Sequence, residues 1–175
     1  MFKKAGIVFA VLIVVLIGLA MTKPDNFSVH RSISINASPE KIFPLINDLH
    51  SWSSWSPWEN IDPAMKKSFS GSTIGIGSVY DWDGNSKVGQ GRMEITQSIP
   101  SSKVIIKLDF LKPVEGHDTA EFTLEPNGNS TTVTWSMSGP SRFITKVMQV
   151  FISMDSMLGK QFETGLGNLK TISEK

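Results

Sequence analysis

The chain has 175 residues, enough for one domain of ordinary size and too few for two. Hydrophobic residues make up 40% and charged residues 19%, with no repeat or low-complexity tract, so the composition indicates a folded globular protein. The 17 basic residues nearly balance the 16 acidic ones, which excludes the basic surface of a nucleic-acid-binding protein. The lack of cysteine excludes a disulfide framework, a thiolate nucleophile and a cysteine zinc site.

The chain begins with an apolar segment. Residues 5–21 read AGIVFAVLIVVLIGLAM and contain no charge. As a helix this run is about 25 Å long, slightly short of a hydrocarbon core of ~30 Å. We therefore expect residues 1–22 to form a transmembrane anchor, joined by a linker at 23–26 to a domain at 27–175.

The charges beside this segment predict its orientation. Lys3 and Lys4 precede the apolar run, whereas the charges after it are balanced. The positive-inside rule then places the N-terminus in the cytoplasm and the domain outside it, in the periplasm, as a single-pass membrane protein. A cleavable signal peptide is the alternative, because Gly18 and Ala20 are small residues suited to a cleavage site, and the domain would then be secreted.

The folded part opens with a predicted strand and a short helix. Apolar residues alternate with polar ones over residues 27–36, which is typical of a strand. Ser38 and Pro39 then suit the N-cap and the first position of a helix. Apolar residues at helical spacing from Ile42 to Leu49 predict that this helix is short and amphipathic.

A tryptophan-rich turn, SWSSWSPW, follows this helix. Trp52, Trp55 and Trp58 fall within seven residues, and Pro57 ends any helix that precedes it. Three interpretations compete: a platform for a sugar or a cation, an anchor at the membrane interface, and the rim of an apolar cavity. Glu59 nearby keeps the cation interpretation open.

The middle of the chain predicts an antiparallel meander. Short alternating runs are separated by loops rich in glycine, proline and asparagine. The expected strands are 66–70, 77–82, 88–97, 103–111, 119–125 and 131–138. Together with the N-terminal strand they predict a sheet of about seven strands.

The C-terminal part predicts a long helix. Apolar residues recur every three or four positions from Phe143 to Leu169, with glycines between 159 and 167. We expect one helix bent at a glycine, or two helices, with the apolar stripe packed on the sheet face that carries Trp135 and Met137.

These motifs resemble one known family. They are RSISINASPEKIFPLINDLHSWSSWSPW at 31–58, YDWDGNSKVGQGRMEIT at 80–96, TVTWSMSG at 132–139 and MDSMLGKQFETGLGNLK at 154–170. From about Phe27 to the C-terminus the chain resembles a membrane-anchored bacterial member of the START-like helix-grip superfamily, also called SRPBCC or the polyketide cyclase/dehydrase and lipid-transport family. The resemblance implies an α+β fold in which a curved antiparallel sheet wraps around the long C-terminal helix.

The resemblance also implies a tunnel or cavity for sterols, lipids, polyketides or other apolar molecules. The sequence offers a surplus of large, adaptable apolar side chains on elements that must face one another. At the rim we expect Trp52 and Trp58 to face inward, and for the walls we expect Tyr80, Trp82, Met93, Phe110, Trp135, Met137, Met148, Met154, Met157 and Phe162. The alternative is that these residues fill a solid core.

Catalytic signals are sparse. The sequence has no nucleophile elbow, HExxH motif, Walker loop or dinucleotide fingerprint, and we expect neither a cofactor nor a metal because the histidines are scattered. His117 is the weak catalytic candidate, a general base if it faces the cavity. Asp81, Glu94 and Asp109 rank below it, since a charged residue that alternates with apolar neighbours usually faces solvent.

We therefore expect a membrane-tethered domain that binds, and transports or sequesters, a small hydrophobic or lipidic ligand between the sheet and the C-terminal helix. One alternative is an enzyme of the cyclase, hydratase or hydrolase type that acts on a hydrophobic substrate in the same cavity. The other is a membrane-tethered adaptor that serves a protein partner and has no ligand.

Overall fold

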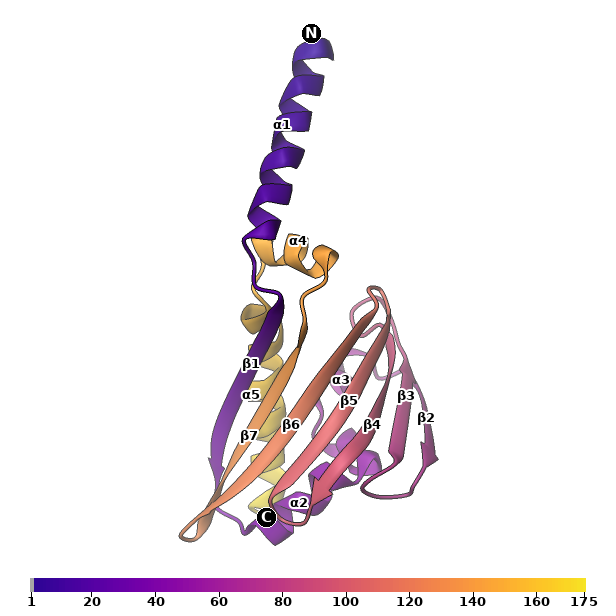
Figure 1. Cartoon of the computed structure of the whole chain (residues 1–175). Coiled ribbons are helices and arrows are strands. Elements are labelled where there is room, and N and C mark those ends of the chain that lie inside the picture. The colour runs from indigo at the N-terminus through magenta and orange to yellow at the C-terminus, as the bar shows by residue number, and fades with distance from the viewer. Residues whose placement is uncertain (1) are drawn as a thin grey trace.

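The computed structural model describes residues 2–175 and shows an N-terminal helix that projects from an α+β domain (Figure 1). This helix, α1, spans Phe2–Met21. Within the described residues it is the one helix long and apolar enough to cross a membrane, with a mean hydropathy of 2.6 over Lys4–Met21. A signal sequence has the same length and composition, so α1 is a candidate span.

The domain contains the predicted antiparallel meander. Within residues 2–175 one sheet has seven strands in the order β1-β7-β6-β5-β4-β3-β2, and every neighbouring pair is antiparallel. The strands are β1 Asn26–Ile35, β2 Lys66–Gly71, β3 Ser78–Asp83, β4 Gln90–Ile99, β5 Lys103–Lys112, β6 Gly116–Asn127 and β7 Ser130–Pro140. The predicted α+β helix-grip fold is confirmed, and the largest shift in a boundary is at the start of β6.

Three short helices link β1 to β2. They are α2 (Pro39–Asn47), the 3₁₀ helix η1 (Leu49–Ser54) and α3 (Pro57–Ile61). Ser38 and Pro39 occupy the N-cap and first helical positions of α2, as predicted. Pro57 both ends the preceding turn and begins α3, because the fixed φ of proline suits the first position of a helix.

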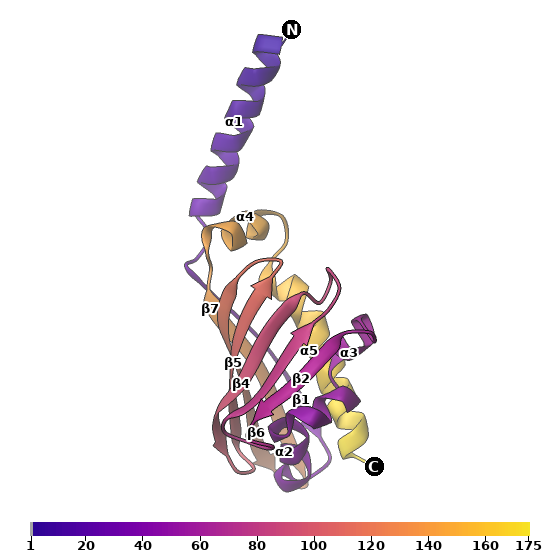
Figure 2. The same cartoon turned by 90° about the vertical axis from the view of Figure 1, so that its right-hand side faces the viewer.

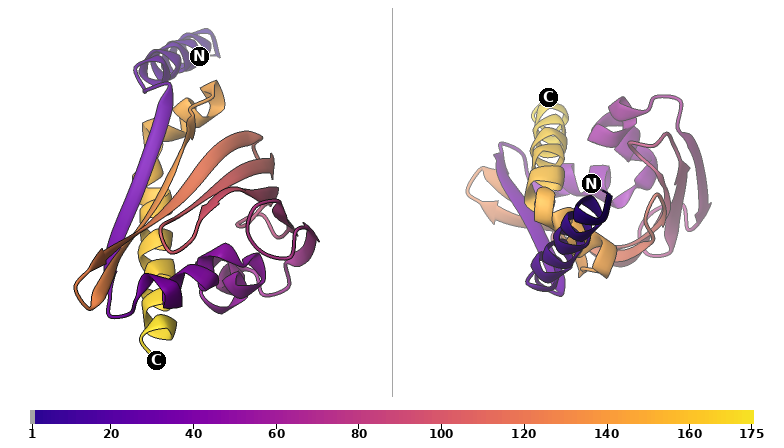
Figure 3. Two further views of the ribbon diagram at one scale, coloured as in Figure 1. Left: turned by 60° about the horizontal axis from the view of Figure 1, so that its bottom comes forward. Right: turned by 90° about the horizontal axis from the view of Figure 1, so that it is seen from above.

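The C-terminal segment forms two helices, α4 (Phe143–Phe151) and α5 (Met154–Ser173). The chain breaks at Ile152 and Ser153 rather than at a glycine, and the Ser153 side chain accepts a hydrogen bond from the Ser156 N–H to cap α5. The sheet curves around α5, as two further views show (Figure 3).

The prediction that the whole apolar stripe packs on the sheet is wrong for α4. None of the nine described residues of α4 is buried, and Phe151 is 73% exposed. In α5, by contrast, Phe162, Leu166 and Leu169 are buried in the core. The turn at 152–153 redirects the chain, so the two halves of a continuous sequence pattern face different surroundings.

The tryptophan turn contributes the centre of the core. Trp55 is 1% exposed and its Nε1–H donates to the Leu45 carbonyl oxygen at 2.9 Å. Its ring lies 4.7 Å from that of Trp52 and meets Phe122 and Trp135 edge to face, at 6.0 and 5.7 Å. Trp55 therefore joins the helical segment after β1 to the sheet.

We expect Trp55→Ala to lower the free energy of unfolding by about 3–5 kcal/mol, because it removes a buried indole and leaves the space unfilled. Trp58→Ala, at a half-buried position, is the matched control and should have a smaller effect. Thermal and urea unfolding of the full chain in detergent measure both. Equal losses would contradict the placement of Trp55 at the centre of the core.

Candidate ligand cavity

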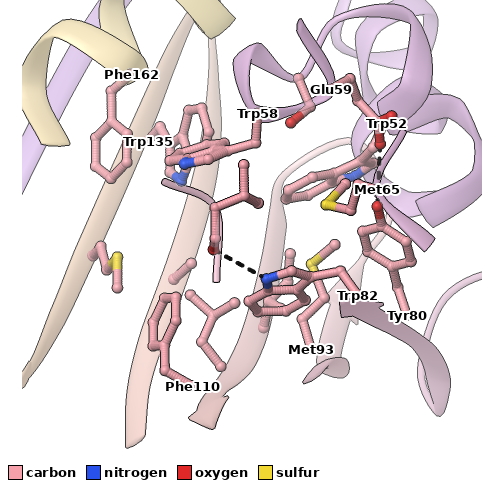
Figure 4. A pocket seen from close by; sticks show the side chains of 16 residues that line it. Trp52, Trp58, Glu59, Met65, Tyr80, Trp82, Met93, Phe110, Trp135 and Phe162 are labelled. Atoms are coloured by element: carbon pink, nitrogen blue, oxygen red, sulfur yellow. Dashed lines mark hydrogen bonds between the residues drawn. The ribbon is translucent and has the colours of Figure 1, made fainter. Parts of the chain in front are cut away.

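A cavity of about 100 Å³ lies between the sheet, α3 and α5 (Figure 4). Its walls are largely apolar and aromatic, and Glu59 supplies the charged group among them. The lining residues are Trp52, Ser56, Trp58, Glu59, Met65, Tyr80, Trp82, Val88, Met93, Ile106, Leu108, Phe110, Ala120, Trp135, Met137 and Phe162.

The structure brings most of the proposed pocket residues together on these walls. They are Trp52, Trp58, Tyr80, Trp82, Met93, Phe110, Trp135, Met137 and Phe162. Met148, Met154 and Met157 do not line the cavity: Met154 packs against the core, and Met148 and Met157 are each 41% exposed. Contact of the lining residues with a ligand stays a prediction.

Sequence reasoning missed several lining residues, although a signal for them existed. Ile106 and Leu108 share a face of β5 with Phe110, and Ala120 lies on the inner face of β6. Alternation along a strand assigns residues two apart to one face, so Phe110 alone implied the other two of β5.

Glycines let two bulky rings lie against backbone. Trp82 lies across Gly91 on the neighbouring strand, where any Cβ would collide with the indole ring. A Cβ at Gly165 of α5 would lie 2.8 Å from the Trp135 ring and 3.1 Å from Pro57. These glycines therefore set how closely α5, α3 and the sheet approach around the cavity.

Trp135 lies at the centre of the aromatic walls and contacts several other rings. Its ring stacks on Phe162 at 4.3 Å and on Phe122 at 4.9 Å, and Trp58 meets it edge to face at 5.5 Å. The indole is 3% exposed, and among the described residues its Nε1–H has no hydrogen-bond partner. Buried donors are usually paired, and among the described residues only the hydroxyls of Ser78 and Ser173 share this unpaired state.

One side of the cavity is polar. The Tyr80 hydroxyl donates to Glu59 Oε1 at 3.1 Å, and the Lys67 ammonium donates to Oε2 of the same carboxylate at 2.5 Å. Burial, reinforced by the charge of Glu59, raises the pKa of Tyr80 well above its usual range. Tyr80 therefore keeps its proton and acts as a hydrogen-bond donor.

The half-exposed lining residues mark the mouth of the cavity. They are Trp58, Glu59, Val88, Leu108 and Phe110. Trp58 thus matches the rim interpretation, whereas Trp52 is buried and donates its Nε1–H to the Ile46 carbonyl oxygen at 2.9 Å. The tryptophan turn therefore combines a rim residue, a wall residue and, in Trp55, a core residue.

His117 lies away from the cavity. Its side chain is 54% exposed and its Nδ1 is 2.7 Å from Asp109 Oδ1 on the outer face of the sheet. Along β6, Ala120 and Phe122 point inward, so the odd-numbered His117 points outward. The suggestion that His117 acts as a base in the cavity is therefore wrong on position.

The second-rank carboxylates also follow the outer face. Asp81 pairs with Arg92 at 3.5 Å, and Asp109 accepts from Lys107 at 2.8 Å. The Lys107 hydrogen bond, with a smaller one from His117, lowers the pKa of Asp109. Within residues 2–175 no group of three or more His, Cys, Asp or Glu side chains is placed to hold a metal ion.

Asp118, the neighbour of His117, lies on the inner face of β6 but does not line the cavity. It follows the inward parity of Ala120 and lies over Gly139, whose missing Cβ leaves room for the carboxylate. Burial raises the pKa of Asp118 to about 6, and the neighbouring His117 opposes this shift. Extending the alternation of β6 by one step, from Ala120, would have identified it.

A family model described as polyketide cyclase / dehydrase and lipid transport matches residues 26–174. The chain belongs to this family. The resemblance drawn from the sequence motifs is thereby confirmed, and family membership supports binding of a hydrophobic ligand or a cyclase-type activity. A comparison with curated proteins gives no match.

Solved structures show the same fold at low sequence identity. Protein CV1439 from Chromobacterium violaceum is 13% identical with a TM-score of 0.59, over 87% of this chain and 99% of that chain. Protein MLL2253 from Mesorhizobium loti is 17% identical with a TM-score of 0.59, over 83% and 96%. The di-domain ARO/CYC BexL from the BE-7585A biosynthetic pathway is 13% identical with a TM-score of 0.63, over 91% of this chain and 53% of that chain, so the chain spans about half of it.

Asp118 predicts a pH dependence of stability. Its pKa of about 6 in the folded protein exceeds the ~3.9 of an unfolded aspartate, so folding favours the protonated form. Its stabilising contribution is therefore full below about pH 4 and is lost as the pH rises through 6. We expect Asp118→Asn to be more stable than wild type at pH 7, by on the order of 1–3 kcal/mol, and to match it near pH 4.

Thermal unfolding of both proteins from pH 4 to 7.5 measures this difference. Asp109→Asn is the matched control. It should be less stable than wild type at pH 7, because the pKa of Asp109 is lowered and the charged form is favoured in the fold. A difference between Asp118→Asn and wild type that does not change with pH would contradict the assignment.

Proposed function

We propose that the domain binds a small hydrophobic or lipidic ligand in the cavity between the sheet, α3 and α5. The observation that carries the proposal is an apolar, aromatic cavity whose wall contains the unpaired N–H of Trp135. A solid core would leave no such space. Membership of a family described by cyclase, dehydrase and lipid-transport functions supports the same conclusion.

The volume of the cavity limits the size of the ligand. Its volume of about 100 Å³ is below the ~300–1,000 Å³ of a drug-sized site and nearer the ~150 Å³ of an apolar cavity that binds benzene. It therefore suits a single ring or a short stretch of acyl chain, and a longer molecule would extend through the mouth. A displacement of Trp58, half-exposed on the short α3, would enlarge the site.

The polar groups suggest which functional groups the ligand carries. Trp135 Nε1 is fully buried, so an oxygen of a carbonyl, ester or hydroxyl group would accept its hydrogen bond only after the neighbouring rings move. At the opposite side Glu59 is already paired with Lys67 and Tyr80, so this cluster suits an uncharged polar group better than a second cation. A mostly apolar molecule with one or two oxygens satisfies both sides.

In this proposal α1 is a retained anchor that keeps the domain beside a bilayer. Lys3 and Lys4 favour a cytoplasmic N-terminus, with the domain on the extracytoplasmic side. A hydrophobic ligand partitions into membranes, so a tethered binding domain lies close to its source. This arrangement is suited to lipid transport or sequestration.

Ala120→Phe tests ligand binding. Ala120 lines the cavity at 3% exposure, so a phenyl ring there fills the space without replacing a polar group. We expect wild type to co-purify with lipid and the full-length variant to carry much less, and the variant to bind the fluorescent fatty acid cis-parinaric acid at least ~10-fold more weakly, a change of about 1.4 kcal/mol.

Thr119→Phe is the matched control, because the adjacent side chain is exposed on the outer face of the same strand. It should bind like wild type. Native mass spectrometry from detergent micelles and the transfer of tryptophan emission to the bound probe give independent readouts. A wild-type protein that carries no lipid and binds no probe would refute the proposal and favour an adaptor role.

Acid–base catalysis in the cavity is the second candidate function. The observation in its favour is the carboxylate–phenol contact of Glu59 and Tyr80 on the cavity wall. A carboxylate can remove a proton from a bound ligand, and the phenol can donate a hydrogen bond to a developing oxyanion once its O–H turns from Glu59 to the ligand. Cyclisation and dehydration both require such proton transfers.

Glu59→Gln separates this candidate from simple binding. The amide keeps the size of the carboxylate and one acceptor oxygen for Tyr80 or Lys67, but it is not a base. We expect turnover of a natural ligand to fall ~10²–10⁴-fold while its affinity stays within a few-fold of wild type. Mass spectrometry that recovers the ligand unchanged from both proteins would leave binding as the function.

A further inference from the structure

Helix α4 presents its apolar side to the outside. Lys146 and Gln149 point back to the protein, where Lys146 Nζ donates to Asp25 and Gln149 Nε2 donates to Ser141 Oγ at 3.1 Å. Its exposed apolar side chains, together with that of the residue after the helix, are Phe143, Ile144, Met148, Phe151 and Ile152, at 41–73% exposure. A surface helix of a soluble domain shows the reverse arrangement.

The place of α4 is fixed by contacts with the end of α1. The two helices contact one another, and Ala20 in the last turn of α1 is fully buried. The Ser141 N–H donates to the Asp25 carbonyl oxygen at 2.7 Å, which ties the start of α4 to the segment after α1. Two views show α4 lying across the lower end of α1 (Figures 1 and 2).

We infer that α4 is a second membrane contact, an amphipathic helix that lies in the lipid interface at the foot of α1. This inference rests on the proposed anchoring by α1. With α1 across the bilayer, α4 lies along the membrane surface, and its apolar side chains reach roughly 5–10 Å into the boundary between headgroups and acyl chains. The occupant of this apolar face is thus the lipid bilayer.

Continuity with α1 is the reason to choose the bilayer over a second protein. The exposed apolar surface of α1 reaches Leu19 and Met21, directly beside α4, so one surface passes from the span to the interfacial helix. The exposed Leu111 at the end of β5 and Met157 in the first turn of α5 lie at the same end of the domain. A protein partner would have to cover α4 and leave α1 to lipid.

The inference also orients the cavity. Trp82 and Phe110 lie near the ends of β3 and β5, and Val88 lies in the loop after β3. The antiparallel register places these strand ends at the end of the sheet where β7 leads into α4. The mouth of the cavity therefore faces the membrane, and a ligand enters from the bilayer.

The natural lack of cysteine gives a direct test, since single cysteines can be introduced and labelled without background. The full chain is prepared as Phe151→Cys, Val14→Cys and Asn129→Cys, each labelled with a nitrobenzoxadiazole fluorophore, in phosphatidylcholine/phosphatidylglycerol vesicles. A doxyl group on the lipid chain, near the headgroup or deeper, quenches a fluorophore at its depth. All three positions are exposed, and Asn129 lies in the β6–β7 turn at the far end of the sheet.

We expect the shallow doxyl lipid to quench the label at position 151 and the deep one to quench the label at 14, with no quenching at 129. Quenching at 14 with none at 151 would overturn the inference and leave the anchor intact. A blue-shifted but unquenched label at 151 would assign the face to a second copy and also overturn it. No quenching at 14 or 151 would overturn the anchor and the inference together, whereas ligand binding is tested separately by Ala120→Phe.

Discussion

The stacking of Trp135 between Phe122 and Phe162 is the constraint on which the rest of the domain depends. Phe122 belongs to the sheet and Phe162 to α5, so one indole joins the two layers. Trp55 and Trp58 meet the same ring from the tryptophan turn. Rings at these separations favour offset-stacked and edge-to-face contacts, which fix orientation as well as distance. The cavity wall is therefore rigid at its centre.

This packing has a consequence for binding. An indole held on both faces cannot turn to find a partner for its N–H, so the donor stays unpaired in the interior. An unsatisfied buried donor costs about 1–3 kcal/mol, a cost that a bound oxygen acceptor would remove. In our proposal, the interaction that stabilises the layers would thus also contribute to the affinity for a ligand. Gly165 allows it, because a side chain there would separate α5 from Trp135.

Helix α5 carries charged side chains toward the edge strand β1 and apolar side chains toward the cavity. Arg31 of β1 lies over Gly159 and pairs with Asp155 and Glu163, each at 2.7 Å. These ion pairs hold α5 to the edge of the sheet where solvent reaches them. Phe162 faces the cavity instead. Because these charges are paired on the solvent-exposed side of α5, they are not buried, and the side of α5 that lines the cavity can be apolar.

The sequence predicts the strands and most of the cavity because alternation and composition are local signals. Ile106, Leu108 and Phe110 follow directly from the alternation of β5, and extending the alternation of β6 puts His117 on the outer face and Asp118 on the inner face. The exposure of the apolar face of α4 could not be predicted from the local sequence pattern. Phe143 and Phe151 continue the apolar periodicity of α5, and periodicity indicates which residues share a face without indicating what covers that face. Trp55 was missed for a similar reason, since three tryptophans in a turn do not reveal which is deepest.

The placement of α4 and the cavity mouth at one end of the sheet links the two proposals physically. A lipid that crosses water before it binds must expose its apolar surface, at about 25 cal/mol per Å². Transfer through a mouth that faces the bilayer avoids this exposure, so the barrier to loading depends on the motion of the rim and not on solvation. Trp58 is the element suited to that motion, because α3 is a single short turn with one indole at the opening and Pro57 fixing its start. In the proposed arrangement α1 sets the distance from the membrane, α4 sets the tilt, and Trp58 controls access.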